Sequence, residues 1–309
     1  ANINTTDLSV FSQEVRLAGG DDDLNWIIGG YYSSDEMDEY YHYFMSDSVY
    51  GFGSIPWGVG LFAATPILEL DTKQKQETES LAVFGHVEWR FADAWRLTVG
   101  ARYTSEERDW SGCTFVADDG TLAAFLNANF GSSLGVGDCG TIDDDPNSPA
   151  FIFAVIGTPN VNDAFHVYSD TIDTDRLMGK VTLDYAVNDD VLLYGTVSNG
   201  FKSGGFNGAN SNTTLQLHPI EEEVLTAYEV GVKATLLDNT MQLNAATFFY
   251  DYQDKQETDA HVAFVGNISG LTNAPESEIK GIELDMLWLP GNGWDVRFNI
   301  AWLDSEVTE

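Results

Sequence analysis

The chain has 309 residues, a hydrophobic fraction of 43% and a mean hydropathy of −0.16, which exclude both a disordered chain and a helical membrane protein. Its 49 acidic and 14 basic residues give a formal net charge of −35. Because a surface this negative repels the phosphate backbone, we expect no nucleic-acid partner. An aromatic content of 13% and 29 glycines suit many strands joined by tight turns.

The first predicted strands, residues 11–18 and 26–33, flank a polar turn at 19–23. A clearer pair follows at 81–91 and 95–103, where Leu81, Val83 and Val87 alternate with residues such as Ala82 and His86. Apolar residues two apart indicate a strand with one apolar face, whereas a helix would place them three and four apart. Each pair is therefore predicted to be an antiparallel hairpin.

Three more hairpins follow along the chain. They are predicted at 177–187 with 191–198, at 228–236 with 241–252, and at 279–289 with 294–303. The five hairpins together predict about ten strands. Four much longer connections separate them, at 34–76, 109–170, 207–222 and 257–275.

Short and long connections alternate strictly, as they do in outer-membrane barrels with short periplasmic turns and long extracellular loops. The pattern predicts an all-β fold, an antiparallel transmembrane β-barrel. Aromatic residues gather near the short turns, as in an interfacial belt; the alternative is a soluble β-protein whose aromatic residues cover a core. These residues are Trp26, Trp89, Phe91, Trp95, Tyr185, Trp288 and Trp294.

Two cysteines, Cys113 and Cys139, lie in one Gly- and Asp-rich segment, and their spacing fits neither a redox nor a zinc motif, so we expect a loop disulfide. The acidic runs 21–23, 35–39 and 143–145 are interpreted as solvated loops, with divalent-cation binding as the alternative. We expect no metal site, cofactor or enzymatic activity, because no catalytic motif occurs and the histidines lack ligand spacing. They are His42, His86, His166, His218 and His261.

Residues 200–207 read GFKSGGFN, which resembles a segment common in TonB-dependent receptors. Further matches follow in the family's order. They are EEE at 221–223, YEVGVK at 228–233, FFYDYQD at 248–254, and NA at 273–274 followed by IKGIE at 279–283; SQEVRL at 12–17 matches near the start. The chain therefore resembles the middle portion of a TonB-dependent receptor barrel.

The resemblance implies that residues 1–309 are part of a barrel domain of 22 strands, whose plug domain and C-terminal strands are not in this chain. It further implies a bacterial outer-membrane protein that actively imports a scarce, bulky nutrient, most often an iron–siderophore complex. The implied partners are the TonB energy-transducing complex, acting through the plug, outer-membrane lipid, and a small-molecule cargo such as a ferric siderophore. A passive outer-membrane pore and a surface β-protein that binds glycans without transport are the alternatives.

Aromatic rings with polar edges suit a bulky cargo, so aromatic residues expected in the long loops are candidates for cargo contact, although they could instead pack loop against loop. Phe201 and Lys202 of the GFKSGGFN segment join them. The candidate substrate-binding residues are Tyr41, Tyr43, Phe44, Trp57, Trp110, Phe201 and Lys202. Charged strand residues are expected to face the barrel lumen, namely Glu229, Lys233, Lys280 and Glu283.

Overall fold

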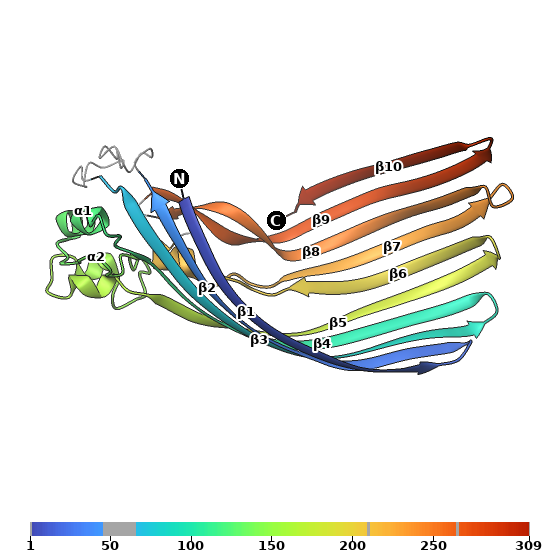
Figure 1. Ribbon diagram of the computed structural model, residues 1–309, viewed down its shortest axis with the longest axis horizontal. Coiled ribbons are helices and arrows are strands. Elements are labelled where there is room, and N and C mark those ends of the chain that lie inside the picture. Colours follow the sequence, from blue (N-terminus) through green and yellow to red (C-terminus); the bar gives the residue numbers. More distant parts are fainter. Residues whose placement is uncertain (1, 46–65, 209–210, 264–265, 309) are drawn as a thin grey trace.

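The computed structural model describes residues 2–45, 66–208, 211–263 and 266–308. They form one antiparallel sheet of ten strands in sequence order, curved like part of a barrel wall (Figure 1). The strands are β1 (Asn2–Gly20), β2 (Leu24–Phe44), β3 (Glu69–Ala92), β4 (Trp95–Phe115), β5 (Tyr168–Asn188), β6 (Val191–Lys202), β7 (Glu223–Leu236), β8 (Met241–Ala263), β9 (Gly266–Gly291) and β10 (Trp294–Val307).

The five predicted hairpins are confirmed, and local chemistry explains their tight turns. Between β1 and β2, the carboxylate of Asp21 accepts the backbone N–H groups of Asp23 and Leu24, each at 2.9 Å. These two bonds lower the pKa of Asp21. Between β9 and β10, Asn292 and Gly293 both adopt positive φ, at 54° and 80°, a conformation that asparagine and glycine tolerate.

Three of the four predicted long connections are too long, because the strands continue past the hydropathy pattern, whereas the connection predicted at 207–222 begins earlier, at residue 203. The connections 34–76 and 109–170 shrink to 45–68 and 116–167. The long loop predicted at 257–275 is wrong, since β8 and β9 stay paired from Thr258↔Leu271 to Ala263↔Gly266. Beyond a membrane both faces of a strand meet water, so the apolar alternation that reveals a strand disappears while the backbone pairing continues.

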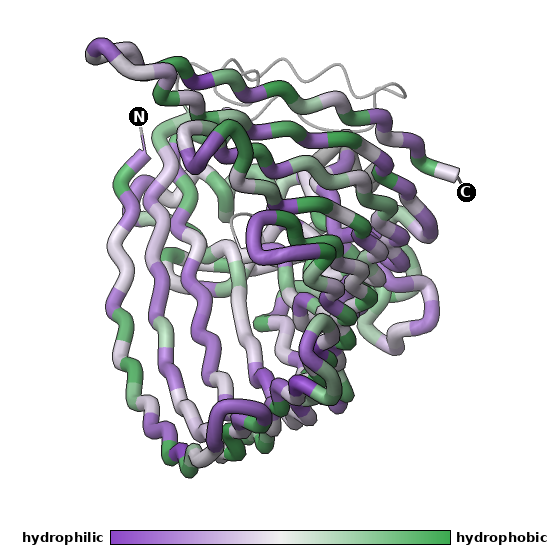
Figure 2. The backbone as a smooth tube through the Cα atoms, turned by 90° about the vertical axis from the view of Figure 1, so that its right-hand side faces the viewer, coloured by the Kyte–Doolittle hydropathy of each residue, from purple (hydrophilic) through white to green (hydrophobic). Residues whose placement is uncertain are grey.

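The sheet has two chemically different faces, because residues directly paired across strands point the same way. On one face, the outer face, apolar side chains stand free: Leu81 and Val83 are each 58% exposed. On the other, the inner face, small and polar residues such as Ala82 and its partner Thr104 are buried. Figure 2 shows the resulting alternation of hydropathy along the strands.

The outer face carries a limited apolar band. On β3 it spans residues 81–91, close to the 9–11 residues or so that a tilted strand needs to cross a bilayer. The band ends near the short turns in an aromatic cluster on the outer face. Ring centroids are 5.5 Å apart for Trp89–Phe91, 6.4 Å for Phe91–Trp95 and 4.5 Å for Trp95–Tyr185. This arrangement matches the predicted interfacial belt.

The connection 116–167 folds into a small unit of its own at the long-loop end (Figure 1). It contains α1 (Thr121–Phe130), α2 (Ile152–Val155) and the 3-10 helix η1 (Val161–Ala164). Leu126, Ile152 and Ala164 are almost fully buried in its core. Among the described residues, no helix is long and apolar enough to cross a bilayer.

The two cysteines meet at the base of this unit. The structure joins Cys113, on β4, to Cys139 in a disulfide with a Cα–Cα distance of 6.0 Å. An isolated β-bridge between Phe115 and Cys139 holds the two segments side by side at the same place.

Candidate functional site

The candidate site lies on the inner face at the long-loop end, where β2, β3 and β4 meet the segment that follows β6. We call residues 203–208 and 211–222 of that segment the strap; it contains α3 (Thr214–Leu217). The strap begins with the SGGFN residues of the GFKSGGFN motif. Glycines at the start of the strap suit a bend, because a strand of glycine is weak.

A hydrogen-bonded row crosses the inner face from β2 to β4. The Tyr41 hydroxyl donates to Glu39 Oε2 at 3.2 Å, and the Gln74 amide on β3 donates to the same carboxylate oxygen. Trp110 on β4 donates its indole N–H to Gln74 Oε1 at 3.3 Å. Gln74 and Trp110 are both buried, so each polar group needs the partner it has.

The strap packs directly on this row. Phe206 stacks on Trp110 with ring centroids 5.2 Å apart and an interplanar angle of 13°. Leu217 of α3 is fully buried against the same pair of rings. Gly112 leaves room for the indole ring, since a Cβ there would lie 2.4 Å from it. The strap therefore forms an aromatic contact with the inner wall.

The strap is also tied to parts of the chain far from β6. Asn207 Nδ2 and Gln216 Nε2 both donate to the carbonyl oxygen of Ser269 on β9, at 3.2 and 2.6 Å. The backbone N–H of Leu215 donates to Asp144 Oδ1 at 2.9 Å, in the unit 116–167. The strap thus reaches from β9 to β3 and β4 across the inner face.

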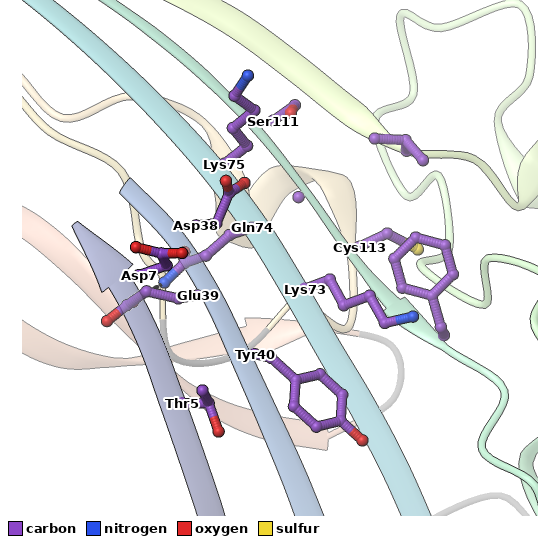
Figure 3. A pocket seen from close by; sticks show the side chains of 13 residues that line it. Thr5, Asp7, Asp38, Glu39, Tyr40, Lys73, Gln74, Lys75, Ser111 and Cys113 are labelled. Carbon is purple, nitrogen blue, oxygen red and sulfur yellow. Dashed lines mark hydrogen bonds between the residues drawn. The ribbon is translucent and has the colours of Figure 1, made fainter. Parts of the chain in front are cut away.

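A second concave feature lies on the outer face at the same end of the sheet (Figure 3). This outer pocket has a volume of about 430 Å³. Lys73 Nζ lies 5.9 Å from the Tyr40 ring centroid and 5.1 Å from that of Phe115. The Tyr40 hydroxyl donates to Asp71 at 2.8 Å; burial, followed by that bond, raises the pKa of Tyr40 to about 12.

The structure brings together only some of the candidate residues. Tyr41 and Tyr43 share the inner face of β2 and stack at 5.9 Å, on the same wall as Trp110. The expectation that they lie in loops is wrong, as it is for Phe44: all four belong to strands.

The remaining candidates are scattered. Phe44 lies on the outer face, in an edge contact with His42 at 4.5 Å. Phe201 also points to the outer face, whereas Lys202 points to the inner face opposite Glu223. Trp57 lies outside the described residues.

The prediction that four charged strand residues face the lumen is wrong for one of them, Lys280. Glu229, Lys233 and Glu283 point inward, and Glu229 accepts the hydroxyl of Tyr194 at 2.6 Å. Lys280 points outward instead and pairs with Asp304 at 3.2 Å. Lys280 and Glu283 are three positions apart, and an odd spacing on a strand always places two residues on opposite faces.

The sequence analysis missed Glu39, Gln74 and Phe206. Glu39 belongs to the acidic run 35–39, which was interpreted as a solvated loop, yet strand alternation turns it inward. The chemistry of the site is that of binding: aromatic faces, an amide and a carboxylate. Within the parts of the chain that the structure describes, no group of three His, Cys, Asp or Glu residues could hold a metal ion.

Comparisons with known proteins agree with this architecture. The profile of the family described as "TonB dependent receptor-like, beta-barrel" matches residues 2–309. The pesticin receptor of Yersinia pestis is 31% identical over 136 residues, which cover 43% of this chain and 19% of that protein. A probable TonB-dependent siderophore receptor of Acinetobacter baumannii, PiuA, is 30% identical over 111 residues, 36% of this chain and 14% of that protein.

A solved structure shows the same fold. The ferric yersiniabactin uptake receptor FyuA from Yersinia pestis aligns with a TM-score of 0.66 and 18% identity, over 99% of this chain and 37% of that one. The chain therefore covers less than half the length of these receptors.

Proposed function

Because the chain belongs to the TonB-dependent receptor β-barrel family, we propose that the complete protein actively imports a scarce, bulky nutrient, specifically an iron–siderophore complex. The family consists of outer-membrane transport receptors and not of enzymes, so this chain is part of the wall of an outer-membrane barrel. The curated relatives that it matches over part of their length include a protein described as a siderophore receptor, which supports this cargo class.

The observation that carries the proposal is the aromatic and polar wall at the extracellular end of the lumen. Tyr41 and Tyr43 line the inner face there, beside the strap, which covers the buried ring of Trp110. A cargo that enters from outside meets rings that can stack and polar ends that can donate or accept hydrogen bonds. We propose that TonB supplies the energy through a plug domain, as in the family.

The test is uptake of radioactive iron by cells that lack the gene for the full-length protein. Each ferric siderophore of a defined panel is supplied in turn, and the gene is restored on a plasmid. Uptake that requires both the restored gene and TonB supports the proposal. Uptake that persists without TonB, or leakage of small hydrophilic solutes through the restored protein, would instead indicate a passive pore.

A further inference from the structure

Three basic residues lie together on the inner face of β4 and β5, in a chain that has 49 acidic residues and only 14 basic ones. Arg102 on β4 is directly paired with Met178 on β5. Arg176 and Lys180 lie two positions to either side of Met178, so all three basic side chains point to the same face. The Cα atoms of such diagonal neighbours are about 7–8 Å apart. We call Arg102, Arg176 and Lys180 the basic patch.

The basic patch lies in the lumen, deeper than the strap. Arg102 is on the same face of β4 as Trp110 but eight positions nearer the short turn, which is roughly 25 Å along a strand. The next residue on β4, Tyr103, is paired with Val83 in the outer apolar band, so the patch is level with the membrane. A cargo that moves inward from the strap therefore meets the patch next.

Two of the three cations have no acidic partner. In the described part of the chain, no carboxylate lies within ion-pair distance of Arg102 or Lys180. Arg102 Cζ lies 5.3 Å from the ring centroid of Tyr31 and 5.7 Å from that of Phe84, and its Nε donates to Thr104 Oγ1 at 3.1 Å. These contacts hold the guanidinium in place and leave its terminal nitrogens free for a ligand. The side chain of Lys180 is exposed on the inner face.

The third cation shows what the patch can bind. Arg176 forms an ion pair with the carboxylate of Glu222, the last residue of the strap. Because the strap crosses the inner face on the extracellular side of the patch, this carboxylate reaches the patch from the side on which cargo enters. Glu222 thus stands where a ligand carboxylate would stand, and its approach favours a cargo over a domain that fills the lumen from the periplasmic side.

We propose that the basic patch binds a free carboxylate of the imported iron complex once the cargo has passed the strap. Arg102 supplies the planar fork that matches a carboxylate, and Lys180 adds a second charge beside it. Two like charges held side by side repel each other, so an anionic ligand that contacts both stabilises the wall. The inference rests on the proposed import and narrows its cargo to siderophores that carry free carboxylates.

The test locates the carboxylate and does not depend on transport. The full-length receptor, purified in detergent, is mixed with iron(III) citrate, which carries carboxylates. A carbodiimide then joins a carboxylate to a lysine amine beside it as an amide, and peptide mass spectrometry locates the amide. Lys233 is the reference lysine, because it is also exposed on the inner face while its paired neighbours Leu192 and Asn244 carry no charge.

We expect citrate coupling at Lys180 to exceed that at Lys233 about tenfold, the factor that one further charged hydrogen bond supplies. Arg102→Gln should bring the two lysines to the same level. Glu222→Gln frees Arg176 and should raise coupling at Lys180. The comparison of the two lysines in the wild-type receptor keeps the test valid if a variant folds poorly.

Equal coupling at Lys180 and Lys233 in the wild type, or unchanged coupling at Lys180 in Arg102→Gln, would overturn the proposal. So would an amide between Lys180 and a carboxylate of the protein itself, because the partner of the patch would then be the plug domain. Failure of the proposed import is seen separately. Iron uptake that does not require TonB would refute active import, whereas citrate coupled at Lys180 would still establish the carboxylate site.

Discussion

Trp110 on β4 and Gln74 on β3 are joined by a hydrogen bond of 3.3 Å between two buried side chains. The two residues are diagonal neighbours on the inner face, because Gln74 is paired with Gly112 and Trp110 with Gln76. Gln74 also donates to Glu39, so the row is continuous across three strands. The bond fixes the indole ring in the orientation on which the strap rests.

The first prediction concerns the anchor of the strap. Trp110→Ala removes the ring that stacks on Phe206 and should cost about 3–5 kcal/mol locally, whereas Trp110→Phe loses mainly the hydrogen bond, about 1 kcal/mol. Hydrogen exchange of strap amides, followed by mass spectrometry, should rise strongly in Trp110→Ala and weakly in Trp110→Phe. Trp89→Ala on the outer face is the control. Equal strap exchange in Trp110→Ala and wild type would show that the stack does not hold the strap.

The second prediction concerns the disulfide. The chain has only two cysteines, so alkylation of the denatured, non-reduced chain should label neither Cys113 nor Cys139, and alkylation after reduction should label both. Replacing both with serine removes a link across 26 residues and should destabilise the unit 116–167 by about 3 kcal/mol. Limited proteolysis within that unit measures the effect. Labelling without reduction would refute the bond.

The third prediction concerns the lipid-facing band. Val99 lies on the outer face opposite Val87, well inside the apolar band. Val99→Arg should therefore lower the free energy of unfolding by about 2–4 kcal/mol near the bilayer midplane. Glu107→Arg, on the same face of β4 but above the band, is the control and should change little. Folding titrations in lipid vesicles measure both, and equal costs would argue against lipid contact at Val99.

The sequence predicted the wall of the barrel better than its extracellular end. Alternation revealed residues 81–91 because one face of that strand meets lipid and the other does not. The same principle explains the failure at 257–275, where β8 and β9 remain paired but the sequence shows no strict alternation of apolar and polar residues. The period-two pattern carries no information where both faces meet the same solvent.

The site was predicted only in part for a related reason. Tyr41, Tyr43 and Trp110 were chosen for their ring chemistry and do share the inner wall. Phe44 was chosen on the same grounds but lies on the outer face of the sheet. The sequence did not show this, because the hydropathy pattern does not reveal the register of β2 so far from the membrane. Contacts such as Phe206 on Trp110 join segments far apart in the chain, and only the folded strap brings them together.

The fourth prediction follows from the raised pKa of Tyr40. Burial, and then the hydrogen bond to Asp71, raise the pKa of Tyr40 to about 12 from its ordinary value of 10.0. A raised pKa means that the folded state holds the proton more tightly, so this contribution to stability is present below pH 10 or so and is lost as the pH rises toward 12. Ultraviolet titration of phenolate, wild type minus Tyr40→Phe, should show a midpoint near 12. Asp71→Asn should lower that midpoint, and an unchanged midpoint would remove Asp71 as a cause.

The last prediction separates the two faces of β2 and rests on the proposed import of a ferric siderophore. Tyr41 points to the inner face, whereas Phe44, three positions away, points to the outer face. If cargo binds the inner wall, Tyr41→Ala should weaken binding about tenfold, through loss of a stacking ring of about 1–2 kcal/mol, while Phe44→Ala should leave it unchanged. Both substitutions remove one ring from the same strand, so Phe44→Ala controls for general damage to β2.

Binding is measured by quenching of intrinsic fluorescence in the purified full-length receptor, with the ferric siderophore that supports uptake in cells. A loss confined to Tyr41→Ala would assign the cargo to the inner wall. Equal losses in both variants would instead mean that β2 only supports a site elsewhere. The inner wall would then be excluded as the cargo surface even if uptake itself required TonB.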